Sequence, residues 1–138
     1  MTEFIIFVSE QWILVSCLIA LLYLLAFTEK RKSGRSISAL QVAPLVNSED
    51  AVVLDVRDTA EFRAGHIVDS INIPYAKVEA RISELEKYKD SPLIVTCKMG
   101  QHSPSIGRML RRHGFTQVCR LEGGIEDWRG SSMPLIKD

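Results

Sequence analysis

The chain has 138 residues, of which 46% are hydrophobic and 25% are charged, and 17 Lys and Arg balance 17 Asp and Glu. This composition excludes a disordered tail, a collagen-like chain and a disulfide-stapled mini-protein, because the apolar content is high and only three cysteines occur, in scattered positions. From residue 36 onward the chain has 13 basic and 14 acidic residues, so we expect no polybasic surface and no nucleic-acid partner.

The first predicted element is a transmembrane helix over residues 11–28, preceded by a short N-terminal segment, residues 1–10. Its 18 residues carry no charge, and at roughly 1.5 Å per helical residue they span about 27 Å, close to the thickness of the hydrocarbon core. A cleaved signal peptide would need basic residues before the apolar run, whereas Glu3 and Glu10 precede it. A buried core helix is the other alternative, but the rest of the chain is too small to enclose one.

A basic flank and flexible tether are predicted over residues 29–36. All four basic residues of the first 35 follow the apolar run: Lys30, Arg31, Lys32 and Arg35. The positive-inside tendency therefore places the N-terminus outside the cell and residues 37–138 in the cytoplasm. The sequence predicts a single-pass membrane protein, whose membrane-protein partner, if it has one, is not identified.

The remaining residues alternate between strand-like and helical patterns. Helical segments are expected over 38–46, 58–65, 78–85, 104–113 and 125–128, and strands over 51–55, 67–73, 93–96 and 117–121. Pro44 is tolerated only near a first turn, so the helix around it is expected to start late or to be irregular. The alternation predicts an α/β fold with a central, mostly parallel sheet flanked by helices, whose ligand sites lie at the carboxyl ends of the strands.

Cys97 directly follows the buried strand over 93–96 and begins a short loop before the next helix. The loop residues are Lys98, Met99, Gly100, Gln101, His102 and Ser103. Such a loop turns backbone N–H groups toward one point, glycine permits the curvature, and the helix dipole adds positive potential. A cysteine there is favoured as the nucleophilic thiolate, and Ser103 is expected to cap the helix that starts at Pro104. An inert buried cysteine remains the alternative.

Metal and cofactor chemistry is not expected. Cys119 lies inside a predicted strand and is assigned to packing. No two cysteines have CxxC spacing, and His66, His102 and His113 do not cluster at the spacing of metal ligands.

Five ordered motifs between residues 37 and 134 resemble the rhodanese-like domain family. They are Asp55-Val56-Arg57, Glu61-Phe62, Gly65-His66-Ile67, Asn72-Ile73-Pro74, and the Cys97 loop with Gly114-Phe115, Leu121, Gly123-Gly124 and Trp128 after it. The resemblance implies a rhodanese fold over 37–138 and sulfur transfer through a persulfide on Cys97. It implies a small donor such as thiosulfate and an unknown thiol or protein acceptor.

The resemblance also assigns roles to other residues. Lys98 to Ser103 would form the loop that binds substrate and persulfide. Asp55, Arg57 and Glu61 are expected to form a structural cluster, and His66 is expected to be a hydrogen-bonded structural histidine. With its N-terminal anchor the chain looks like the membrane-anchored, single-domain rhodanese-like proteins of bacteria, which implies the cell inner membrane.

Two positions depart from the family pattern. Asp69 stands where the family often has glycine, and we expect it to alter a turn. His102 stands where many active members have arginine in the loop. A fixed cation there would bind thiosulfate or stabilise the persulfide, whereas histidine is charged only part of the time near neutral pH, and Lys98 is expected to compensate in part.

Two other functions compete with sulfur transfer. A phosphatase or arsenate-reductase-like enzyme would also use a cysteine in a loop of N–H groups, but its C-x5-R pattern requires arginine at position 103, where this chain has Ser103. A membrane-tethered, non-catalytic binding or adaptor module is the second alternative. Cys97 and Gly100 argue against the adaptor, and His102 argues for it.

Overall fold

The computed structural model describes residues 1–32, 34–48 and 50–137, and it divides into two compact units, Met1–Arg31 and Lys32–Asp138. The first unit is the shorter of the two, and the second has the size of one domain.

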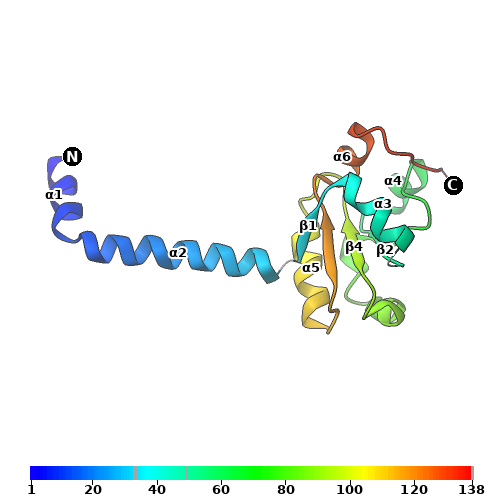
Figure 1. The fold of residues 1–138 in the computed structure, drawn as a ribbon, viewed down its shortest axis with the longest axis horizontal. Helices are drawn as coiled ribbons and strands as arrows, with labels where there is room; N and C mark the ends of the chain where they lie inside the picture. The colour runs from blue at the N-terminus through cyan, green and yellow to red at the C-terminus, as the bar shows by residue number, and fades with distance from the viewer. Residues whose placement is uncertain (33, 49, 138) are drawn as a thin grey trace. The chain divides into compact units, whose positions relative to one another are not determined.

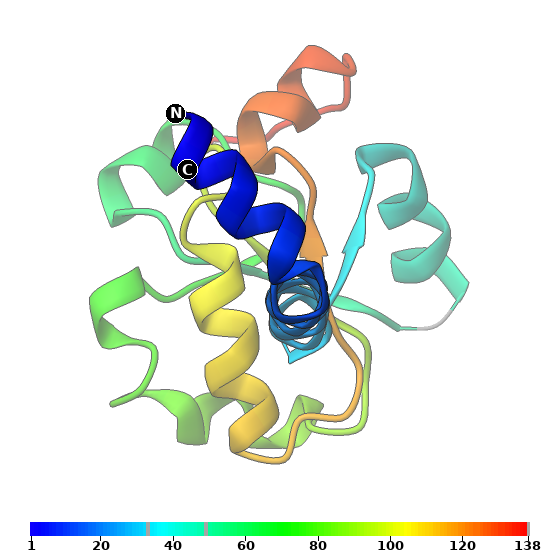
Figure 2. The same ribbon diagram turned by 90° about the vertical axis from the view of Figure 1, so that its left-hand side faces the viewer.

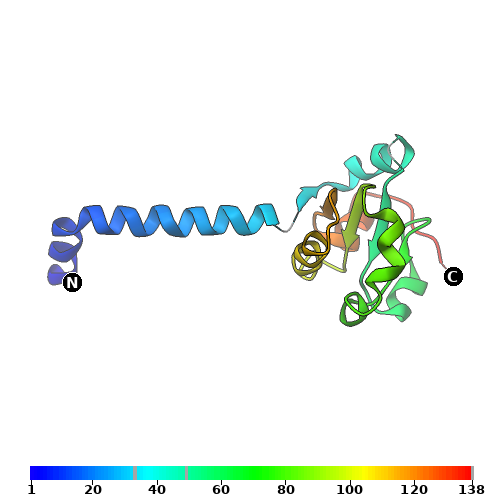
Figure 3. The ribbon, with the colours of Figure 1, turned by 90° about the horizontal axis from the view of Figure 1, so that it is seen from below.

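Two helices make up the N-terminal unit. Helix α1 (Thr2–Glu10) and helix α2 (Trp12–Lys32) meet at a bend at Gln11, which Figure 3 shows. The expected helix over 11–28 is confirmed as a helix and continues to Lys32, and the segment before it is itself helical. Within α2, the 18 residues Trp12–Glu29 have a mean hydropathy of 2.1 and none is buried, so this helix is long and apolar enough to cross a membrane.

A parallel five-stranded sheet forms the centre of the second unit (Figure 1). Its order is β1-β5-β4-β2-β3 and every pairing is parallel. The strands are β1 (Arg35–Ile37), β2 (Val52–Asp55), β3 (Ile71–Asn72), β4 (Leu93–Thr96) and β5 (Val118–Leu121). The structure confirms the predicted α/β fold with a central parallel sheet.

Helical segments cover both faces of this sheet. They are α3 (Ala39–Ser48), α4 (Thr59–Ala64), the 3₁₀ segments η1 (Tyr75–Lys77) and η2 (Ile82–Tyr88), α5 (Ser103–Arg112) and α6 (Gly124–Gly130). Figure 2 shows α5 and the 3₁₀ segments on one side and α3 on the other. Every residue of β4 is buried, because it pairs on both edges and is covered on both faces.

The first strand corrects the prediction of a flexible tether. Residues 35–37 pair in parallel with residues 119–121 of β5, and Arg120 Nε donates a hydrogen bond to the carbonyl of Gly34 at 3.4 Å. The earlier part of that stretch, up to Lys32, continues α2, and Ser33 lies outside the described residues. The sheet therefore begins with β1, because backbone pairing along the open edge of β5 orders a polar segment.

Three further expectations differ from the structure in detail. Of the strand predicted over 67–73, only Ile71 and Asn72 pair with β2. The helix predicted over 78–85 is η2 and the turns before it, because apolar spacing does not separate a 3₁₀ from an α-helix. Helix α3 starts at Ala39 and contains Pro44 in its interior, so of the two expected outcomes it does not start late but is irregular, since Pro44 has no N–H to donate within the helix.

Candidate active site

Cys97 lies at the carboxyl end of β4, immediately after Thr96. Its side chain is 1% exposed. The backbone N–H of Gly100 donates to Sγ at 3.0 Å, and the hydroxyl of Ser103 donates to the same sulfur at 3.4 Å. Hydrogen-bond donors aimed at a sulfur favour its anionic form. The structure thus brings the predicted nucleophile, Gly100 and Ser103 together.

The loop after Cys97 curves around its sulfur. Gly100 has φ +89°, in the left-handed region that favours glycine, and this conformation turns its N–H toward Sγ. Ser103 is the first residue of α5 and His102 occupies the N-cap position without a side-chain capping bond. Ser103 was expected to cap the helix, and this is corrected: its buried hydroxyl serves Sγ instead.

Helix α6 holds the Cys97 loop through backbone hydrogen bonds. The backbone N–H of Ile125 donates to the carbonyl of Cys97 at 2.9 Å, and the N–H of Glu126 donates to the carbonyl of Lys98 at 3.0 Å. Gly124 has φ +60°, and a Cβ at this position would collide with the carbonyl oxygen of Cys97. In the sequence Gly123-Gly124 was recognisable only as part of the family motif; in the structure Gly124 lies against the loop that carries Cys97.

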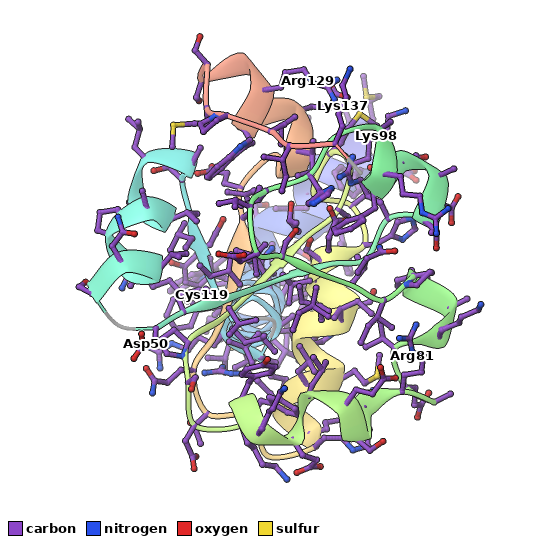
Figure 4. The ribbon with its side chains drawn as sticks, turned by 90° about the vertical axis from the view of Figure 1, so that its right-hand side faces the viewer. Asp50, Arg81, Lys98, Cys119, Arg129 and Lys137 are labelled. Atoms are coloured by element: carbon purple, nitrogen blue, oxygen red, sulfur yellow. The ribbon has the colours of Figure 1, made fainter. Side chains whose placement is uncertain are left out.

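A pocket of about 380 Å³ opens beside Cys97. The residues that line it are Val56, Arg57, Asp58, Glu61, Pro74, Tyr75, Ala76, Cys97, Lys98, Gln101 and His102. The predicted loop residues Lys98, Gln101 and His102 thus border the pocket, whereas Met99 is exposed and does not. Figure 4 shows Lys98 toward the same end of the domain as Arg129 and Lys137, far from Arg81.

Tyr75 is a pocket residue that sequence reasoning missed. Its ring lies 4.5 Å from the imidazole of His102, with the planes inclined by 36°. Tyr75 follows β3 and His102 precedes α5, so the contact joins segments 27 residues apart. In the sequence, only its position directly after the motif Asn72-Ile73-Pro74 could have suggested that Tyr75 lies at the site.

Asp55 and Arg57 form a buried ion pair, and Arg57 also borders the pocket. Arg57 Nη2 lies 2.8 Å from Asp55 Oδ2, Arg57 Nε donates to both carboxylate oxygens, and Nη2 also donates to the carbonyl of Gly65 at 2.7 Å. Asp55 further accepts the backbone N–H of Arg57 at 3.0 Å. Glu61 was expected in this cluster; it is exposed and borders the same pocket as Arg57, and among the described residues no hydrogen bond joins it to Asp55 or Arg57.

His66 lies away from the pocket. It is 4% exposed, its Nδ1 is 2.8 Å from the carbonyl of Phe62, and its ring stacks on that of Phe62 at 3.9 Å. This environment fits the structural role expected for His66. Nearby, Asp69 has φ +60°, so aspartate adopts here the left-handed conformation that glycine favours.

No group of three or more metal-ligating side chains occurs among the residues that the structure describes. Cys119 is half-buried on β5, where it packs against the core cluster that contains Ile37 and Leu121.

Comparisons with known proteins agree with this geometry. Residues 38–131 match the family model of the rhodanese-like domain. The chain is 36% identical over 141 residues to the uncharacterized protein YibN of Escherichia coli K12, with 99% of each chain covered. It is 34% identical over 95 residues to the thiosulfate sulfurtransferase GlpE of Coxiella burnetii, covering 69% of this chain and 87% of GlpE.

Solved structures show the same architecture. A rhodanese-related protein from Thermoplasma volcanium superimposes with a TM-score of 0.68 at 31% identity, covering 75% of this chain and 99% of the other. A thiosulfate sulfurtransferase from Pseudomonas aeruginosa gives a TM-score of 0.67 at 25% identity, covering 75% of this chain and 20% of that one. The chain belongs to the rhodanese-like domain family, which includes sulfurtransferases.

Proposed function

We propose that the protein is a sulfurtransferase that carries sulfane sulfur as a persulfide on Cys97. The observation that carries the proposal is the environment of Cys97 Sγ. This buried sulfur accepts hydrogen bonds from the N–H of Gly100 and the hydroxyl of Ser103, and Cys97 lines an open pocket. The thiosulfate sulfurtransferase GlpE, among the relatives, supports thiosulfate as the donor.

The reaction has two steps. The Cys97 thiolate attacks the outer sulfur of thiosulfate, a bond forms between Sγ and that sulfur, and sulfite leaves with the electrons of the broken S–S bond. An acceptor thiolate then attacks the outer sulfur of the persulfide, and Cys97 leaves as a thiolate. The donors at Gly100 and Ser103 lower the energy of the anionic sulfur at the beginning and end of the cycle.

We further propose that α2 anchors the protein in the cell inner membrane. The basic residues that follow the apolar run support an orientation with the N-terminus outside and the rhodanese-like domain in the cytoplasm. In this arrangement the domain acts at the membrane surface, within reach of a membrane-protein partner.

Intact mass spectrometry of the full chain in detergent tests the sulfur-transfer proposal. After thiosulfate treatment we expect the mass of one added sulfur atom, which a thiol removes, and no addition in Cys97→Ser. Cys119→Ser is the matched control and should still gain the sulfur. Absence of the adduct in the wild type would refute the proposal and favour the non-catalytic adaptor.

A further inference from the structure

The pocket beside Cys97 has room for a partner molecule. Its volume of about 380 Å³ falls in the range of small-molecule sites. In the reaction proposed above, the acceptor thiol must enter this pocket to reach the outer sulfur. The charged groups around the pocket therefore act directly on the acceptor.

Two carboxylates stand on one wall of this pocket. Asp58 and Glu61, three residues apart at the start of α4, are both exposed and both border the pocket. Residues at this spacing lie on one side of a helical turn. We call this pair the acidic wall.

Internal structure does not account for the acidic wall. Asp58 occupies the N-cap position of α4, where aspartate ordinarily accepts a backbone hydrogen bond, yet its side chain makes no capping bond. Among the described parts of the chain, no hydrogen bond or ion pair engages the carboxylate of Asp58 or Glu61. The two carboxylates thus remain available to a molecule in the pocket.

The cations around the pocket do not balance the acidic wall. Arg57 borders the pocket, but its guanidinium is held by Asp55 through three side-chain hydrogen bonds, so its charge is compensated. Apart from Arg57, the described lining residues that can carry a positive charge are Lys98 and His102. A persulfide anion on Cys97 would add another negative charge.

We propose that the acidic wall selects the acceptor by charge, and that the acceptor is a thiol with a positively charged ammonium close to its sulfur. Opposite charge concentrates such a thiol in the pocket. The same field opposes anions, both an anionic thiol and the thiosulfate of the loading step, so the selection concerns the discharge of the loaded enzyme. The inference rests on the proposed function. In the selected step the thiolate of the aminothiol bonds to the outer sulfur, the bond from that sulfur to Sγ breaks, and Cys97 leaves as a thiolate.

The test measures how fast different thiols discharge the loaded enzyme. The full chain in detergent is loaded with thiosulfate, the added sulfur is verified by intact mass, and its loss is followed with cysteamine, 2-mercaptoethanol and 3-mercaptopropionate. The quantity of interest is the ratio of the rate constants for cysteamine and 3-mercaptopropionate. Comparing this ratio between variants cancels the intrinsic reactivities of the two thiols.

We expect Asp58→Asn/Glu61→Gln to lower this ratio about tenfold from the wild-type value, with a smaller decrease in Glu61→Gln alone. The neutral 2-mercaptoethanol should change least. Asp90→Asn is the matched control: it removes an exposed carboxylate near the amino end of β4, outside the pocket lining, and should keep the wild-type ratio.

The outcomes separate this inference from the proposed function. A wild type that gains no sulfur would refute the proposed function. A loaded enzyme with equal ratios in the wild type and the double variant would overturn the acidic wall, as would an equal decrease in Asp90→Asn. Should the double variant fail to load, the single variants Asp58→Asn and Glu61→Gln decide, and ratios equal to the wild type in both would overturn the proposal.

Discussion

At the scale of single residues, His102 bears most directly on the donor step. It borders the pocket, its ring is in contact with that of Tyr75, and it stands where many active members of the family have arginine. A guanidinium is charged at all accessible pH values, whereas an imidazole is largely neutral at alkaline pH. We expect His102→Arg to raise the rate of sulfur loading from thiosulfate at pH 8 about tenfold, equivalent to about 1.4 kcal/mol.

The same assay includes two comparisons. His102→Ala should slow loading without abolishing it, because Gly100 and Ser103 still donate to Sγ. His113→Arg makes the same substitution at an exposed position just after α5, outside the pocket lining, and should leave the rate unchanged. Equal initial rates for the wild type and both His102 variants, measured by intact mass, would contradict a role for charge at this position.

The buried pair of Asp55 and Arg57 predicts a loss of stability. In Asp55→Asn the guanidinium of Arg57 keeps its hydrogen bond to the carbonyl of Gly65 but loses the negative charge that compensates it. Both side chains of the pair are almost inaccessible to solvent. Removing one partner of a buried pair costs about 3–5 kcal/mol in the free energy of unfolding. Urea-dependent proteolysis of the full chain measures this change, with the exposed Asp90→Asn as the control; a change below about 0.5 kcal/mol in Asp55→Asn would contradict it.

Some of these residues were predictable and others were not, for a physical reason. Cys97 and Gly100 are recognisable because the strand, the loop and the helix that create their environment are contiguous in the sequence. Tyr75 and Gly124 reach the same site from segments more than 20 residues away, so only the folded chain brings them to Cys97. Glu61 was expected in a structural cluster with Asp55 and Arg57 from the family resemblance, whereas Asp55 alone supplies the carboxylate that Arg57 binds.

At the scale of elements, α6 holds the Cys97 loop through backbone bonds. Gly124→Ala places a methyl group against the carbonyl of Cys97 at a residue with φ +60°, so the loop must move. Because a displacement of about 1 Å costs on the order of a hundredfold in rate, we expect sulfur loading to fall by at least about that factor. Intact mass after thiosulfate treatment measures it.

Gly130→Ala provides the matched control for this substitution. Gly130 ends the same helix, and a Cβ there meets nothing within 4 Å. Its loading rate should equal that of the wild type. A similar rate in Gly124→Ala would show that the contact between α6 and the loop does not position Cys97.

The elements themselves were predictable where the apolar pattern was long. Strands β2 and β4 are largely buried on both faces, and this burial requires the near-continuous apolar runs by which they were recognised. Strand β1 has only three residues, two of them exposed and polar, and it exists because β5 offers an open edge. The extent of β3 was overestimated, since an apolar run cannot tell a two-residue pairing from a full strand.

At the scale of the whole molecule, the proposed membrane topology makes a prediction. Two reporters are fused in turn to the C-terminus of the full chain, one that is active only in the cytoplasm and one that is active only in the periplasm. We expect activity only from the cytoplasmic reporter, because four basic residues follow the apolar run and two acidic ones precede it. The matched comparison replaces Lys30, Arg31 and Lys32 with Gln, which should reduce the preference. Periplasmic activity of the wild-type fusion would contradict the orientation.

The strand order also determines when the sheet can be completed during synthesis. Strand β5 is the last strand to leave the ribosome, yet it lies between β1 and β4 in the sheet. The bond from Arg120 to Gly34 joins residues 86 positions apart. Until β5 emerges, the nascent chain carries unpaired edges on β1 and β4, and the support for the Cys97 loop, which follows β5, does not yet exist. Translation therefore delivers Cys97 well before the residues of α6 that hold its loop. A ribosome stalled before residue 118 would hold a chain whose sheet is incomplete and whose Cys97 loop lacks this support.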